Sequence, residues 1–160
     1  VMYPILAYGS GEQREAHLPA LARGERIGSF GLTEPGSGSD PGSMTTRAVA
    51  SGSGYVLNGH KAVVIGAPWA SHLVVTARTG GERRDRSGVS VFVLAKDTPG
   101  VTTRDYVTVD GRRASVGSGS AVWTGAGGDT GTGTWIGAAS GARGGAAACA
   151  DRALAGHPAR

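Results

Sequence analysis

The chain has 160 residues with a formal net charge of +4, and 29 of its residues are glycine. This length fits one domain with some flanking sequence. The single cysteine cannot build a disulfide framework, the four histidines lack metal-ligand spacing, and no apolar run approaches the roughly 18 residues of a membrane-spanning helix. No secretory segment is recognisable, so we predict a cytoplasmic protein with no metal site and no membrane partner.

Residues 1–26 are predicted to be a short helical lead-in. Ser10 and Gln13 have the spacing of a capping box, so a helix should begin directly after Ser10. Pro19 cannot lie inside one continuous helix. We therefore predict that Pro19 opens a second short helix, which Gly24 ends.

At Ile27 the pattern changes to a short strand that runs into a glycine-containing loop, Thr33–Asp40, with the sequence T-E-P-G-S-G-S-D. Pro35 ends the strand because it has no N–H to donate. Gly36 and Gly38 allow tight turns and a close approach to a ligand. The loop therefore offers N–H and O–H donors to a flat ligand with a polar edge.

Further apolar segments, separated by turn residues, continue as far as Ala114. The dipeptide Asn58-Gly59 is typical of a two-residue hairpin turn and is predicted to separate two strands. At least six short strands with no helix between them favour an antiparallel β-barrel or sandwich, so the fold class is mainly β. The strands predicted after the first loop are 47–51, 55–57, 60–65, 72–78, 88–96 and 101–109. The first two flank the turn Gly52-Ser53-Gly54 and are predicted to form a hairpin.

After Ala114 neither the strand period nor the helix period persists, and glycine, serine, threonine and alanine dominate. Such a composition lacks the apolar residues that offset ordering entropy. We predict that residues 115–160 are a disordered, low-complexity tail or the product of a changed reading frame near Ser115. In the second case a neighbouring frame of the gene should spell an apolar strand and the start of a helix.

The Thr33–Asp40 loop closely resembles the flavin-binding signature T-E-P-x-x-G-S-D of the acyl-CoA dehydrogenases. The resemblance runs from about Ser10 to Ala114, and residues 105–114 are similar to a divergent bacterial branch, the small subunits of pimeloyl-CoA dehydrogenase. It implies that residues 1–26 end the family's N-terminal helical domain and that residues 27–114 are its middle β-domain.

The resemblance implies FAD as the cofactor, with the segment from Phe30 to Ser39 lining the flavin. Leu32 and Thr33 would bond the polar edge of the flavin, and Gly38 and Ser39 would lie near its phosphate side. Ser39 would also contact the acyl-CoA substrate.

A second flavin contact is implied on the strand after Asn58-Gly59, where the family usually shows K-x-W-I-T-N-G. Val63, Val64 and Ile65 occupy the positions of the tryptophan beside the flavin, the following isoleucine and the threonine near its N5 atom. An isoleucine side chain cannot donate to N5. The alternative for this segment is a plain core strand.

The family's catalytic glutamate lies on a C-terminal helical domain that this chain does not contain, so we predict no catalytic residue here. Asp40 is expected to cap local N–H groups and Glu34 to brace the loop. The resemblance implies a fragment that is inactive alone. When full length it would oxidise the α,β bond of an acyl-CoA, pass electrons to an electron-transfer flavoprotein, and form a homo- or hetero-oligomer.

The alternatives are two other classes of protein. One is a non-catalytic binding module or subunit that holds a partner or an acyl thioester without flavin chemistry. The other is a nucleic-acid-binding β-barrel, but the arginines are scattered and the sequence lacks the alternating aromatic and basic positions of such surfaces. We therefore predict no nucleic-acid partner.

Overall fold

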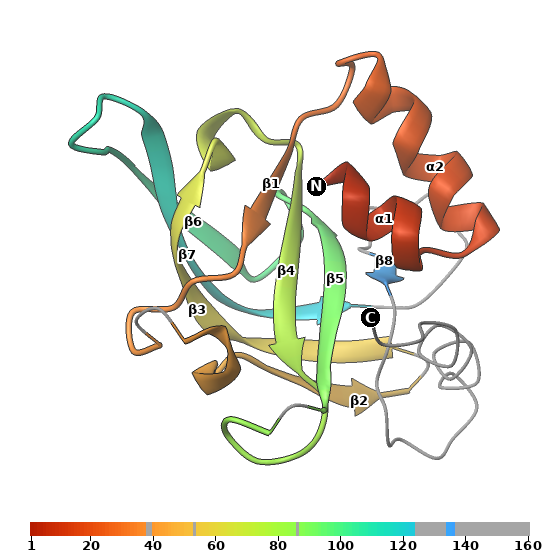
Figure 1. Ribbon diagram of the computed structural model, residues 1–160, viewed down its shortest axis with the longest axis vertical. Coiled ribbons are helices and arrows are strands. Elements are labelled where there is room, and N and C mark those ends of the chain that lie inside the picture. Colours follow the sequence, from red (N-terminus) through yellow and green to blue (C-terminus); the bar gives the residue numbers. More distant parts are fainter. Residues whose placement is uncertain (38–39, 53, 86, 124–133, 137–160) are drawn as a thin grey trace, which may run out of the picture.

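The computed structural model describes residues 1–37, 40–52, 54–85, 87–123 and 134–136. Two N-terminal helices, α1 (Met2–Tyr8) and α2 (Gly11–Ala22), precede a mainly β domain (Figure 1). The short 3-10 turns are η1 (Pro41–Ser43) and η2 (Ala67–Trp69). The strands are β1 (Gly28–Gly31), β2 (Arg47–Ser51), β3 (Gly54–Ile65), β4 (His72–Arg78), β5 (Val89–Ala95), β6 (Val101–Val107), β7 (Arg113–Trp123) and β8 (Thr134–Ile136). The predicted fold class, mainly β with a helical lead-in, is confirmed.

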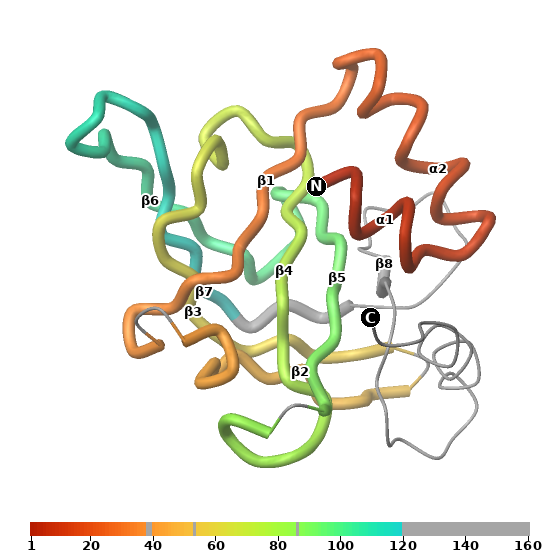
Figure 2. Tube along the Cα trace, viewed as in Figure 1, coloured from red at the N-terminus to blue at the C-terminus, as the bar shows by residue number. Residues whose placement is uncertain are grey.

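The strands form one mixed sheet in the order β6-β7-β3-β2-β4-β5-β8, with β1 beside β4. Most neighbours are antiparallel, but β1 runs parallel to β4, and β2 meets β4 in parallel at one residue pair. The β2–β3 hairpin lies between β1 and β4 in the chain and supplies the long crossover connection that a parallel pair needs. Among the described strands, β6 and β8 end the order without pairing with each other, so the barrel is not closed. Figure 2 shows β2 and β3 running across the lower end of β4 and β5.

The predicted helix start is confirmed. The Gln13 amide donates to Ser10 Oγ at 3.2 Å, and the Ser10 amide donates to Gln13 Oε1 at 2.8 Å. Gly24 follows the helix with φ 72°, as predicted for a terminating glycine. The prediction that Pro19 opens a second helix was wrong, because α2 runs through it. Pro19 is exposed, so water can hydrate the helical carbonyl that it cannot pair.

Two hydrophobic clusters lie on opposite faces of β4 and β5. The inner cluster includes Leu73, Val75 and Phe92, and the Tyr55 ring meets Phe92 edge to face at 5.4 Å between centroids. The outer cluster joins the two helices to the sheet. Its buried members are Ile5, Val74 and Val93, and Val1, Leu18, Leu21 and Val91 pack against them. Because alternate residues of a strand face opposite sides, β4 is buried on both faces.

The predicted hairpin between β2 and β3 is confirmed by antiparallel pairing from Arg47 with Asn58 to Ser51 with Gly54. The predicted turn at Asn58-Gly59 was wrong, since β3 continues through both residues. Gly59 serves close packing instead: a Cβ there would lie 2.3 Å from Thr46 Oγ1.

The prediction that strand structure ends at Ala114 was also wrong. β7 continues to Trp123 and pairs with both β3 and β6. Main-chain ladder bonds need no apolar side chains, and a Cβ on Gly119 would lie 2.0 Å from the Gly100 carbonyl oxygen. The predicted disordered tail falls mainly on residues 124–133 and 137–160, outside the described residues.

The small residues of β7 border an apolar cavity of about 70 Å³ inside the sheet. Leu57, Val64, Leu73 and Val101 line it on the apolar side, and Gly117 lines it from β7. The inner core is therefore incompletely filled where β7 crosses it.

Candidate functional site

Two segments that are far apart in the sequence lie side by side at the end of β1. The Ser29 hydroxyl donates to the Ile65 carbonyl oxygen at 2.5 Å, and the Ala62 amide donates to the Thr33 carbonyl oxygen at 2.8 Å. β1 and the start of the Thr33–Asp40 loop therefore lie against the last residues of β3. The structure brings together the two groups of residues predicted as flavin contacts.

The surface of this junction is apolar. The exposed fraction is 37% for Phe30, 50% for Val63 and 44% for Ile65, while Leu32 is partly buried. Val64 is only 5% exposed and its side chain lines the inner cavity. Val64 could therefore contribute to a ligand site only through its main chain.

Polar donors lie directly beside this apolar surface. Thr33 is exposed, and among the described residues no hydrogen bond involves its main-chain N–H, its hydroxyl or the N–H of Leu32. Unpaired donors on a loop beside exposed apolar side chains suit a flat ring with acceptors along one edge. Gly38 and Ser39, the other predicted contacts of this loop, lie outside the described residues.

Val63 has an unusual backbone conformation. It lies at φ 53° within a β-bulge, where the pairing of β3 with β7 shifts between Lys61 and Val64. A β-branched residue at positive φ is strained, and such strain persists only where the surroundings enforce it. The bulge breaks the regular alternation of the strand and leaves Val63 and Ile65 exposed on either side of buried Val64.

A buried carboxylate holds the base of the loop. Glu34 Oε1 accepts hydrogen bonds from Lys61 Nζ at 2.8 Å and from the Thr46 amide at 3.0 Å. Its Oε2 accepts from the Thr45 amide at 2.6 Å and from the Thr45 hydroxyl at 2.7 Å. Lys61 also donates to the Leu32 carbonyl oxygen and to Thr76 Oγ1, both at 3.2 Å. The prediction that Glu34 braces the loop is confirmed.

The same contacts fix the charge of Glu34. Burial alone would raise the pKa of this carboxyl, but the hydrogen bonds from Lys61, Thr46 and Thr45 outweigh burial and lower the pKa to about 2. Glu34 is therefore an ionised structural group, not a free base. Sequence reasoning missed Lys61 as its partner; the available signal was a lysine placed within an otherwise apolar strand.

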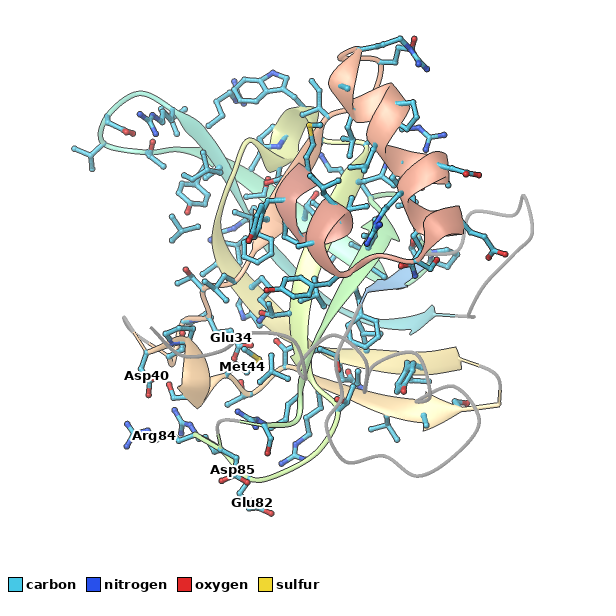
Figure 3. All side chains as sticks on the ribbon, turned by 45° about the vertical axis from the view of Figure 1, so that its right-hand side comes forward. Glu34, Asp40, Met44, Glu82, Arg84 and Asp85 are labelled. Atoms are coloured by element: carbon cyan, nitrogen blue, oxygen red, sulfur yellow. The ribbon has the colours of Figure 1, made fainter. Side chains whose placement is uncertain are left out.

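Asp40 also has a local structural role. Its Oδ1 accepts a hydrogen bond from the Gly42 amide at 2.9 Å and caps η1, as predicted. Its Oδ2 lies 3.3 Å from Arg84 Nε in an exposed ion pair. Figure 3 shows Asp40 and Arg84 next to each other where the first loop meets the β4–β5 loop, with Glu34 further inside beside Met44.

Comparison with known proteins agrees with this arrangement. The family model described as acyl-CoA dehydrogenase, middle domain, matches residues 29–119, more than half of the chain. The chain belongs to the acyl-CoA dehydrogenase family through this domain. A probable acyl-CoA dehydrogenase of Bacillus subtilis, YngJ, is 42% identical over 99 residues, which are 62% of this chain and 26% of the relative. The mitochondrial isobutyryl-CoA dehydrogenase of Dictyostelium discoideum is 46% identical over 95 residues, which are 59% of this chain and 23% of the relative.

Solved structures show the same fold. A glutaryl-CoA dehydrogenase from Mycobacterium smegmatis, in complex with FADH2, is 37% identical with a TM-score of 0.67 and covers 76% of this chain and 31% of its own. The ChsE4-ChsE5 complex from Mycobacterium tuberculosis is 31% identical with a TM-score of 0.70, over 76% of this chain and 31% of its own. The chain thus spans about a quarter to a third of the length of these four relatives. In the part of the chain that the structure describes, no helix is both long and apolar enough to cross a membrane.

Proposed function

We propose that this chain is the flavin-holding middle domain of an FAD-dependent acyl-CoA dehydrogenase. The observation that carries the proposal is the junction of the two segments: Leu32 and Thr33 carry donors that no described residue pairs, and the exposed side chains of Phe30, Val63 and Ile65 lie at the same junction. This donor set fits the polar edge and the flat apolar face of an isoalloxazine. The FADH2 bound in the related glutaryl-CoA dehydrogenase supports the choice of ligand.

The residues of this chain would bind and orient the cofactor. Thr33 and Leu32 would donate to its polar edge, and the apolar side chains would exclude water from one face. The buried Glu34–Lys61 pair would hold the main chain that carries the Leu32 and Thr33 donors in place. When bound, FAD supplies the acceptor for the hydride that leaves the β-carbon of an acyl-CoA thioester during oxidation of its α,β bond.

Neither carboxylate of the Thr33–Asp40 loop is free to remove the α-proton. Glu34 is buried and bonded to Lys61, and Asp40 caps η1. We therefore propose that the base comes from another part of a longer protein, and that this chain alone does not turn over an acyl-CoA. Electron-transfer flavoprotein as acceptor and assembly into an oligomer are further parts of the proposal. The ChsE4-ChsE5 complex is a related protein that assembles from two kinds of chain.

A titration tests the proposal. The purified chain is titrated into FAD and, separately, into riboflavin, and the visible absorbance bands and the fluorescence of the flavin are followed. We expect saturable changes with both ligands, and weaker binding for Thr33→Val, which loses one donor while keeping the side-chain shape. Thr103→Val, on β6, is the matched control. A folded chain, checked by circular dichroism, that changes neither flavin signal would contradict the proposal.

One observation favours a second function, a binding module without flavin chemistry. Val63 and Ile65 stand where the resemblance expects an aromatic residue and a hydroxyl donor, and both side chains are exposed and apolar. Such a surface could pack against a protein partner instead of a cofactor. Absence of flavin binding in the titration above would select this function.

A further inference from the structure

The loop between β4 and β5, residues 79–88, packs against the Thr33–Asp40 loop and the η1 turn that follows it. Its base is closed, because the amides of Thr79 and Gly80 donate to the Gly88 carbonyl oxygen at 2.8 and 3.2 Å. Its tip contacts η1 through the Arg84 amide, which donates to the Gly42 carbonyl oxygen at 3.0 Å. Arg84 adopts φ 73° there, a strained conformation for a non-glycine residue.

A buried arginine joins the two loops from below. Arg78, at the end of β4, is only 2% exposed. Its Nη2 donates to the Gly42 carbonyl oxygen at 2.9 Å, and its Nη1 donates to the Ser87 carbonyl oxygen at 3.2 Å. The side chain contacts main-chain acceptors of both loops, so its guanidinium sets the distance between them.

A second arginine contacts both sides of the first loop from the surface. Arg83 Nε donates to the Ser43 carbonyl oxygen at 3.0 Å, and Arg83 Nη2 donates to the Gly36 carbonyl oxygen at 3.2 Å. Gly36 lies within the Thr33–Asp40 loop, and Ser43 ends the η1 turn that follows this loop. One planar group therefore holds two points of the chain that lie seven residues apart.

The chemistry of these contacts is specific to arginine. A guanidinium presents several N–H donors in a fixed plane, whereas a lysine ammonium is a point charge on a flexible stem. The acceptors are carbonyl oxygens, so the contacts define geometry without neutralising a carboxylate. Holding a loop in its binding conformation before the ligand arrives reduces the ordering cost of binding.

We propose that Arg83 is a positioning residue for the Thr33–Asp40 loop, and that Arg78 and the β4–β5 loop form the support against which it acts. This inference rests on the proposed function, because the loop is taken to hold a flavin. Neither arginine needs to touch the ligand. Arg83 fixes the conformation of the loop that carries Thr33, and Thr33 contacts the flavin.

Arg83 is the better residue to substitute, because it is exposed and its loss should leave the domain folded. Arg83→Gln and Arg83→Lys are compared with Arg112→Gln. Arg112 is an exposed arginine on the β6–β7 turn, paired with Asp110 at 3.2 Å. For each protein the dissociation constant for FAD, the urea midpoint and the hydrogen exchange of amides in residues 36–46 are measured.

For Arg83→Gln we expect FAD binding to weaken by about tenfold, with faster amide exchange in residues 36–46 and little change in the urea midpoint. Arg83→Lys should fail to restore either property, because it lacks the planar fork. Arg112→Gln should match the parent chain in every measurement.

The possible outcomes separate the two proposals. If the parent chain binds no FAD, the proposed function fails. The exchange measurement still tests, independently of FAD, whether Arg83 positions the loop. If the exchange rates in residues 36–46 are the same in Arg83→Gln and the parent chain, the positioning role is overturned. Unchanged FAD affinity in Arg83→Gln, with a parent chain that binds FAD, overturns it as well.

Discussion

Lys61 and Glu34 form a buried ion pair, with Nζ 2.8 Å from Oε1 and side chains that are 7% and 2% exposed. The pair joins β3 to the first residues of the Thr33–Asp40 loop, 27 positions away in the sequence. Two charges this deeply buried depend on each other, because either one alone would lack compensation in a low-dielectric interior.

Replacing one partner of this pair should therefore be strongly destabilising. We expect Lys61→Met to lower the free energy of unfolding by about 3–5 kcal/mol, because it leaves the Glu34 carboxylate buried without a countercharge. The double variant with Glu34→Gln should lose less than the sum of the two single changes. Urea unfolding of the four proteins measures the coupling, and additive losses would show that the pair is not a unit.

The lowered pKa of Glu34 predicts acid sensitivity. This carboxyl has a pKa of about 2 in the folded chain and an ordinary value of 4.5. A group with a depressed folded pKa stabilises the protein above its unfolded pKa, and that contribution is lost as the pH falls from about 5 towards 2. The free energy of unfolding should fall over this range by roughly 3 kcal/mol more in the parent than in Glu34→Gln. Equal slopes in the two proteins would contradict the prediction.

A second pH effect should come from His17 and His72, which link α2 to β4. Their rings meet edge to face at 5.6 Å. Burial lowers the pKa of both, and the charges of His72 and Arg26 lower that of His17 further. For His72, Arg26 adds to the effect of burial and Asp97 opposes it.

Because both folded pKa values lie below the ordinary 6.5, the unfolded chain takes up protons first. Stability should decline as the pH falls through about 6.5 and below. His17→Gln should flatten the dependence of the urea midpoint on pH between about 7 and 5. His60→Gln, on the exposed side of β3, is the control, and a slope unchanged by His17→Gln would refute the link.

Two glycines of β7 should respond in opposite ways to substitution by alanine. A Cβ on Gly117 would have only ordinary contacts, 3.9 Å from the Thr102 carbonyl oxygen and 4.0 Å from Thr103 Cγ2. Gly117→Ala should therefore stabilise the chain by about 1 kcal/mol, through a less flexible unfolded state and partial filling of the cavity.

Gly119→Ala should instead destabilise it by about 1–3 kcal/mol, because a Cβ there would lie 2.0 Å from the Gly100 carbonyl oxygen. Thermal unfolding of both variants makes the comparison. If the unfolding midpoints of both variants shift in the same direction, the space available for a Cβ does not decide the effect of substitution at these two sites.

Restoring a hydroxyl at position 65 should improve flavin binding. Ile65 is 44% exposed at the junction where its carbonyl oxygen accepts from Ser29, so Ile65→Thr adds a donor at the proposed ring site without opening a core cavity. We expect the dissociation constant for FAD to fall by about threefold to tenfold, the value of one added hydrogen bond. Val49→Thr, on the exposed side of β2, is the control. Unchanged or weaker binding in Ile65→Thr would mean that the ring does not reach this position.

Local patterns predicted much of the fold. The capping box at Ser10 and Gln13, the β2–β3 hairpin and the strand at His72–Arg78 all depend on interactions between near neighbours, which a sequence displays directly. At Asn58-Gly59 and along β7, the local preference was overridden by packing and pairing with segments elsewhere in the chain. At Pro19 the helix continues because the position is exposed and water can hydrate the unpaired carbonyl.

The candidate site divides in the same way. The Thr33–Asp40 motif and the departures at Val63 and Ile65 could be recognised in the sequence, because an ordered set of residue types is a local property. Three other features could not be recognised in the sequence: the Glu34–Lys61 pair, the strained bulge at Val63, and the contacts that Arg78 and Arg83 make with the first loop. These features exist only because folding brings β3 and the β4–β5 loop against the first loop, and contacts between such distant positions leave no periodic signal along the chain.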